Sequence, residues 1–220
     1  MVRNAKERQP EKRIFSQQNF VYTQQWVMAR EEFDVTILLF LAFQLEVGLR
    51  EQVVTAFAKL DRFEVSFRQE TFSDFFEDTV VEGKLMVQRP GRMHMTYNKG
   101  DKKTLIWDGV TCYEKDHLAD TETRTPQADV ADEPLVRILL YGEDLGKLFL
   151  IDRLESEVGD VFRFRPRDNQ TWEVEVVFDK DWLPKTLEVI DEEGEGSRFI
   201  FSGYNLDPKF SETRFAIPKG

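Results

Sequence analysis

The period of the hydrophobic pattern changes near residue 62, and this change limits most strongly how the chain can fold. Leu49, Val53, Phe57 and Leu60 recur at the spacing of one face of an α-helix. From residue 63 onward, apolar residues instead alternate with polar ones, beginning with Phe63-Glu64-Val65-Ser66-Phe67. This alternation is typical of a half-buried strand. The sequence therefore predicts one N-terminal helix followed by a β-rich region.

Period-two segments recur to the end of the chain and predict about ten antiparallel strands. After the first strand they are 81–87, 93–97, 104–107, 161–165, 172–178, 186–190 and 198–201. Asp108-Gly109 follows one of these segments and is a strong hairpin signal. Turn-forming residues at 167–169, 179–181 and 191–196 separate the later segments. We expect a meander in which neighbours in sequence are neighbours in the sheet.

One helical stretch interrupts the meander. Pro134 follows two acidic residues, as in a helical first turn, and Gly142 supplies a C-terminal stop. Leu135, Ile138 and Leu139 form its apolar stripe. A sheet of this length must curl, and the two helical pieces are available to cover its concave face. A covered concave face lined with Met and aromatic residues is expected to form an apolar ligand chamber.

Residues 1–48 are an N-terminal extension of poorly determined structure. Its apolar run at 35–43 is too short for a membrane-spanning helix, which needs about 20 residues, but matches the apolar core of a signal peptide. Acidic residues precede the run and no small-residue cleavage site follows it, so the signal is atypical. A true start near Met28 is one explanation, and a core segment leading into the first helix is the alternative. We expect export to the periplasm.

Composition argues against several functions. The net charge of −11 opposes contact with phosphate backbones, so we expect no nucleic-acid partner. The chain has one cysteine and two histidines, and none has the spacing of metal ligands. No phosphate loop or nucleophile motif is present, and the acidic pairs fall in turns. We expect a protein that is not an enzyme and has no cofactor and no metal.

Several motifs together resemble one known family. Phe63–Gln69 has the form aromatic-x-x-x-Phe-x-Gln, and Gly83–Met93 contains Gly-x-Leu followed by Arg-Pro. Asp108-Gly109 comes next, then Phe178-Asp179 with Leu183-Pro184, and finally Phe215-Ala216-Ile217-Pro218-Lys219-Gly220. No single motif is specific, but their order over residues 49–220 resembles the LolA-type periplasmic carriers of outer-membrane lipoproteins.

This resemblance implies a mainly β (α+β) fold: a curved antiparallel half-barrel of about eleven strands, with an N-terminal helix and a short helical lid over an apolar cavity. It also implies a monomeric carrier of acylated lipoprotein cargo. Its other partners would be an inner-membrane lipoprotein-releasing ABC transporter and an outer-membrane lipoprotein receptor. At the family's matching position, Arg89 would latch segment 134–142 through backbone carbonyls. The alternative is a turn arginine pointing into water.

The candidate ligand-binding residues lie on the predicted inward strand faces and on the lid. They are Leu85, Val87, Met93, Met95, Trp107, Trp172, Val174, Val176 and Phe199, with Leu135, Ile138 and Leu139 from the lid. Met86, Met93 and Met95 suit walls that must release cargo, because thioether side chains repack easily. Period-two alternation does not distinguish a cavity from a packed core. Two alternative functions stay open: carriage of a different lipid, and lipid sensing for regulation on the same half-barrel.

Overall fold

The computed structural model describes residues 48–73, 78–141, 145–154, 156, 159–168 and 170–219. It divides into two units, residues 1–47 and 48–220, and every described residue belongs to the second. The expectations for the N-terminal extension, including the apolar run at 35–43, lie outside the described residues. So do Gly142 and the side chain of Leu135.

An antiparallel sheet of eleven strands dominates the described unit. Its strands are β1 (Arg62–Phe72), β2 (Thr79–Gln88), β3 (Arg92–Lys99), β4 (Lys103–Asp108), β5 (Thr111–Asp116), β6 (Thr121–Pro126), β7 (Phe149–Leu154), β8 (Val161–Pro166), β9 (Glu173–Phe178), β10 (Pro184–Ile190) and β11 (Gly196–Asn205). The spatial order is β6-β5-β4-β3-β2-β1-β11-β10-β9-β8-β7. Two meanders therefore meet where β1 pairs with β11. The expected mainly β, curved antiparallel fold is confirmed.

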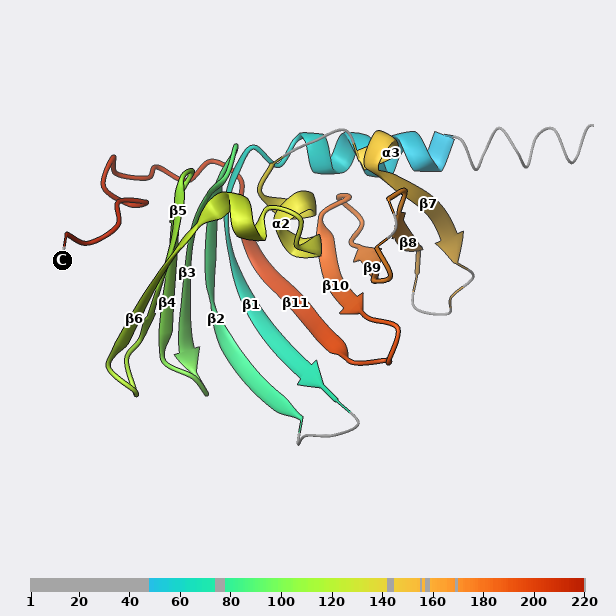
Figure 1. Ribbon diagram of the computed structural model, residues 1–220. Coiled ribbons are helices and arrows are strands. Elements are labelled where there is room, and N and C mark those ends of the chain that lie inside the picture. Colours follow the sequence, from blue (N-terminus) through green and yellow to red (C-terminus); the bar gives the residue numbers. More distant parts are fainter. Residues whose placement is uncertain are drawn as a thin grey trace, which may run out of the picture. The chain divides into compact units, whose positions relative to one another are not determined.

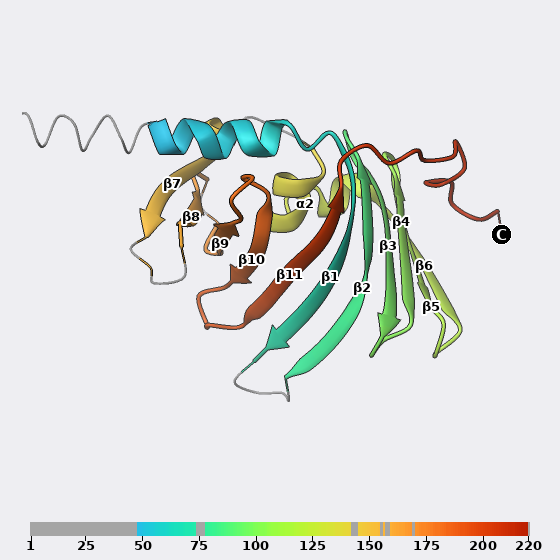
Figure 2. The same cartoon turned by 180° about the vertical axis from the view of Figure 1, so that it is seen from behind.

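Short helices accompany the sheet. The chain is helical over 48–58, and η1 (Gln127–Val130), α2 (Pro134–Leu139) and α3 (Leu145–Leu148) lie between β6 and β7. In both views the sheet curves around α2, and the helix at 48–58 lies across one end of the strands (Figures 1 and 2). Among the described residues, no helix is long and apolar enough to cross a membrane.

Aromatic packing joins the first helix to the sheet. The Phe57 ring meets the Phe164 and Phe178 rings edge-on, with centroids 5.9 and 5.6 Å apart. Phe149 continues this group by packing edge-on against Phe164 at 6.0 Å. Such pairs contribute about 0.5–1.5 kcal/mol each beyond the area that they bury. The helix is thereby fixed over β8 and β9, and its C-terminal end points toward the β2–β3 turn.

Gly83 is required because the Thr96 carbonyl and the Phe67 ring lie too close to this position for any side chain to fit. A Cβ at this position would lie 2.0 Å from the Thr96 carbonyl oxygen and 2.7 Å from the Phe67 ring. The Phe67 ring occupies the space beside Gly83 and meets Tyr97 edge-on at 5.5 Å. The glycine therefore allows the Phe67 ring to lie close against β2 on the inward face of the sheet.

The Asp108-Gly109 hairpin is present between β4 and β5. Asp108 Oδ1 accepts hydrogen bonds from the backbone N–H groups of Val110 and Thr111, both at 2.8 Å. Gly109 has φ +102°, a conformation that side-chain-bearing residues rarely adopt. The side-chain bonds and the glycine together define this turn.

Candidate lipid-binding cavity

An apolar cavity of about 260 Å³ lies between α2 and the inward face of the sheet. Six of the predicted ligand-binding residues line it: Leu85, Met93, Met95, Trp107, Leu139 and Phe199. Six residues that were not proposed also line it: Gln69, Tyr97, Leu105, Val136, Leu140 and Phe201. None of these lining residues is charged, so the cavity suits an alkyl chain.

Strand register brings the cavity wall together. Met95 on β3 stands opposite Leu85 on β2 and Leu105 on β4, and Met93 stands opposite Trp107. Opposed side chains on one face of an antiparallel pair touch, so these residues form a continuous apolar surface. The expectation that Met86 lines the wall is wrong. Met86 lies between the buried residues Leu85 and Val87 and therefore faces the opposite side of β2.

A wider cavity of about 760 Å³ adjoins the apolar one. Gln69, Trp107, Val136 and Phe199 line both. The wider cavity extends toward the ends of β1 and β11, where residues such as Ser73 and Glu195 line it. The apolar cavity therefore opens through a more polar region.

Other proposed residues lie in packed surroundings. Val87, Val174, Val176 and Ile138 have no exposed surface and belong to the hydrophobic core. Trp172 is half-buried, and its ring centroid lies 5.7 Å from that of Phe149. None of these five is among the lining residues of the two cavities. In the sequence, these strand residues alternate with polar residues in the same way as the lining residues do, because both sets face inward.

Arg89, in the turn between β2 and β3, binds the carbonyl ends of two helices. Its Nε donates to the Leu139 oxygen and its Nη2 to the Ile138 oxygen, both at 2.9 Å. Its Nη1 donates to the Phe57 oxygen at 2.5 Å. The last carbonyls of a helix lack partners within that helix, and the forked guanidinium supplies donors to several at once.

The Arg89 side chain is largely withdrawn from water. Desolvation lowers the pKa of its guanidinium to about 10, and nearby Asp61 partly opposes this. Since that pKa remains well above neutrality, Arg89 is charged under physiological conditions. A positive charge at a helix C-terminus is also favoured by the helix dipole. The backbone of the same turn adds a further bond, from Gly91 N–H to the Leu140 oxygen at 2.8 Å.

Two polar residues that the sequence did not indicate also hold the lid region. Buried Gln127 donates to the Gly91 oxygen at 2.8 Å and to the Tyr141 hydroxyl at 3.1 Å, and it accepts from Gly109 N–H at 3.1 Å. Arg137, on α2, pairs with Asp168 in the β8–β9 connection. Gln127 lies in a segment without a clear apolar period, and Arg137 is a polar residue within the predicted lid helix, so no sequence signal indicated either contact.

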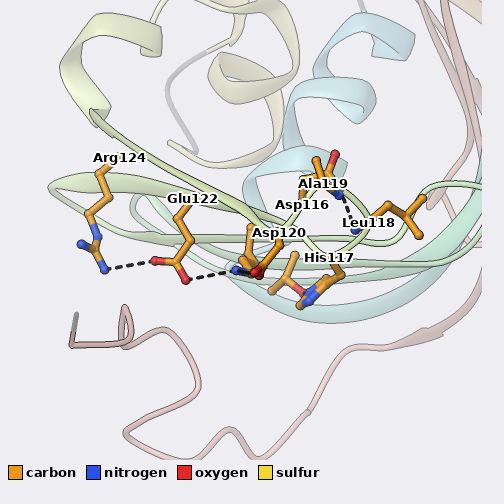
Figure 3. A network of polar contacts seen from close by, with 9 residues as sticks. Asp116, His117, Leu118, Ala119, Asp120, Glu122 and Arg124 are labelled. Atoms are coloured by element: carbon orange, nitrogen blue, oxygen red, sulfur yellow. Dashed lines mark hydrogen bonds and ion pairs between the residues drawn. The ribbon is translucent and has the colours of Figure 1, made fainter.

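A cluster of ionisable groups at the β5–β6 hairpin is exposed and mutually paired (Figure 3). Glu122 pairs with Arg124 at 3.9 Å and with Lys115 at 3.5 Å, and Lys115 also pairs with Asp120 at 2.7 Å. Asp116 accepts two backbone N–H bonds within the turn, and these lower its pKa. These contacts stabilise a hairpin in solvent and do not form a catalytic arrangement. Within the described residues, no group of three or more potential metal ligands occurs.

Comparison with known proteins places this architecture in a family. The family model described as "Outer membrane lipoprotein carrier protein LolA" matches residues 58–218. The chain is similar to an outer-membrane lipoprotein carrier protein of Bordetella avium (strain 197N), with 26% identity over 89% of this chain and 96% of the relative. It is also similar to one of Aeromonas salmonicida (strain A449), with 25% identity over 84% and 93%.

Among solved structures, a LolA superfamily protein from Nitrosomonas europaea aligns with a TM-score of 0.49 and 10% identity, covering 76% of this chain and 97% of the other. The family match begins at the last residue of the first helix and includes all eleven strands, and it confirms the resemblance drawn from the motifs. The chain belongs to the LolA family of outer membrane lipoprotein carrier proteins.

Proposed function

We propose that this chain carries acylated lipoproteins across the periplasm from the inner to the outer membrane, holding their acyl chains in the cavity under α2. The observation that carries this proposal is the triple hydrogen bonding of Arg89 to the lid and the first helix. It joins the two helical segments on one side of an apolar cavity, so movement of the lid and access to the cavity are linked.

Burial of acyl chains supplies the driving force for loading. Each CH₂ group removed from water contributes about 0.8 kcal/mol, so a lipidated protein needs an apolar shelter to cross an aqueous compartment. Release requires that the empty, closed state also be stable. The Arg89 bonds stabilise that closed state and therefore lower the net affinity for cargo.

The remaining parts of the proposal follow from carriage. Cargo would come from an inner-membrane lipoprotein-releasing ABC transporter and pass to an outer-membrane lipoprotein receptor, with the chain acting as a periplasmic monomer and not as an enzyme. Residues 49–220 would form the carrier domain and residues 1–48 an extension. Val87, Trp172, Val174, Val176, Leu135 and Ile138 would border the acyl chains when the lid opens.

Native mass spectrometry of the purified chain tests this proposal. The chain is incubated with a triacylated lipoprotein, with the same protein lacking its acyl groups, or with phospholipid alone. A one-to-one complex with only the acylated protein supports lipoprotein carriage. Binding of phospholipid without lipoprotein would instead favour a carrier or sensor of another envelope lipid. Failure of all three to bind would show that the apolar faces are a closed core.

A further inference from the structure

The inward face of β1 changes from aromatic to polar along the strand. Phe63, Val65 and Phe67 are buried on this face. Because alternate residues share a face, the same side continues with Gln69, Thr71 and the following Ser73. The three polar residues all line the wide cavity, whereas the aromatic end lies toward the helix at 48–58.

The neighbouring strand β11 makes the same change at nearly the same level. Phe67 stands opposite Phe201, whereas Thr71 stands opposite Ser197. Ser197 Oγ lies 3.3 Å from both Gln69 Nε2 and Thr71 Oγ1. Beyond them, Ser73 donates to a Glu195 carboxylate oxygen at 2.8 Å. A polar band therefore crosses two strands between the apolar cavity and the strand ends.

Carboxylates stand on two sides of the wide cavity. Glu133 comes from the start of the lid helix, and Asp191 and Glu195 come from the β10–β11 connection. Asp191 also accepts the backbone N–H groups of Glu193 and Glu195 at 3.0 and 2.9 Å, which fixes this turn. No Lys, Arg or His is among the described residues that line the wide cavity.

We propose that the cavity selects its ligand by the polar end as well as by the acyl chains. The apolar part takes the chains, the hydroxyl and amide band hydrogen-bonds the uncharged ester and amide groups, and the carboxylates favour a cationic polar end. This selectivity rests on the proposed function and specifies its substrate class: acylated peptides whose residues next to the lipid are uncharged or basic. Anionic phospholipids, which carry comparable chains, are disfavoured.

The preference for a cationic polar end has an electrostatic reason: the carboxylates lie at the wide cavity, where ligand and protein are partly removed from water. When the acyl chains occupy the apolar cavity, a phosphate attached to them lies in the wide cavity near three carboxylates. The resulting repulsion is screened less than in bulk water. An ammonium group in the same place is attracted. Hydrogen bonding by Gln69, Thr71 and Ser73 acts equally on both ligands, so charge determines the preference between them. The net charge of −11 adds a general attraction for cationic ligands to that of the three carboxylates.

Two synthetic lipopeptides test this inference. Both carry the same triacylated cysteine and a serine, followed by four lysines in one and four glutamates in the other. Each displaces a fluorescent fatty-acid analogue from the full chain at low ionic strength. We expect the lysine peptide to bind at least about tenfold more tightly, and added salt to reduce this preference.

Variants locate the effect. The triple substitution E133Q/D191N/E195Q keeps the hydrogen-bonding side chains and is expected to remove most of the preference. The matched control E51Q/D207N/E212Q changes the net charge equally at exposed residues that do not line the two cavities, and it should keep the preference. The selectivity, but not the proposed function, would be overturned by either of two results. One is that the unmodified chain binds the lysine and glutamate peptides equally tightly, and the other is that both triple variants change the preference equally. Failure of both peptides to displace the probe would overturn the proposed function as well.

Discussion

Arg137 on the lid helix α2 donates from Nη1 to Oδ2 of Asp168, 2.9 Å away in the connection between β8 and β9. The Arg137 guanidinium also lies 5.4 Å from the centre of the Phe149 ring. Arg89 holds the same helix from the β2–β3 turn. The lid is therefore bound to both meanders of the sheet. Arg89 donates to its backbone carbonyls from one meander, and its own Arg137 donates to Asp168 in the other.

We predict that Asp168→Asn loosens the lid without unfolding the protein. Arg137 is mostly buried, but the Asp168 side chain is 48% exposed, so the pair contributes only about 1 kcal/mol. Hydrogen exchange at the α2 amides should become about fivefold faster, while the thermal midpoint shifts by only a few degrees. The exchanged pair Arg137→Asp/Asp168→Arg should restore part of the protection. Unchanged exchange in the single variant would show that the ion pair does not hold the lid.

Arg89→Leu should bind acylated cargo more tightly and release it more slowly. The substitution removes three hydrogen bonds that stabilise the closed, empty state, and about 2 kcal/mol of lost stabilisation corresponds to roughly a thirtyfold gain in affinity. Stopped-flow transfer of a fluorescent lipopeptide to vesicles measures the release rate. Arg92→Leu, at an exposed residue on β3, is the matched control. Normal release by Arg89→Leu would contradict the latch.

Closure by Arg89 should not depend on pH in the physiological range. Burial lowers its pKa to about 10, so the folded and unfolded chains both keep the guanidinium protonated below pH 9. Above about pH 10 the folded chain loses this proton before the unfolded chain does, so stability from this group rises with pH there. Release rates measured from pH 6 to 8 should therefore have no pH dependence that comes from Arg89. The unmodified chain and Arg89→Lys should show the same pH profile.

His94 should instead contribute a loss of stability in acid. Desolvation lowers its pKa below the ordinary value of 6.5, although its bond to the Arg214 carbonyl partly opposes this. As the pH falls below 6.5, the unfolded chain takes up a proton that the folded chain does not, so unfolding becomes more favourable. Denaturant titrations at pH 7.5 and 5.5 should show a larger loss for the unmodified chain than for His94→Gln. An equal loss in both would contradict this assignment.

Gly83→Ala should destabilise the fold by at least about 2 kcal/mol, because the added Cβ meets backbone and the Phe67 ring and neither can move freely. The cavity should change with it, since Phe67 would be displaced. Gly48→Ala is the control, because its Cβ would meet nothing within 4 Å and alanine favours the helix at 48–58. Urea unfolding of both variants measures the difference, and similar midpoints would refute the steric argument.

The sequence predicts those parts of the fold in which one face of an element is buried. The alternation in β1 identifies that strand because Phe63, Val65 and Phe67 are buried while the residues between them are not. β6 was not identified, because nearly all its residues are exposed and β5 is its only neighbour in the sheet described here. β5 and β7, each six residues long, were also missed. The sheet therefore has eleven strands, of which eight were named from the pattern.

Prediction of the site depended on two different signals. Met93 and Met95 were proposed from alternation, and register places them in the cavity wall. Val174 shows the same alternation but lies in packed core, because what separates wall from core is the position of α2, which alternation does not encode. Arg89 was proposed through family resemblance. Arg137 has no comparable motif, and its role follows only from the distance to Asp168.

The central claim is that acyl chains enter the space between α2 and the inward face of the sheet. Photo-crosslinking tests it most directly: a triacylated peptide with a diazirine near the end of one chain is loaded, irradiated and mapped by mass spectrometry. We predict crosslinks to Leu85, Met93, Met95 or Leu139, with higher yield in Arg89→Leu. Crosslinks confined to the opposite face, for example at Met86 or His94, would contradict the account.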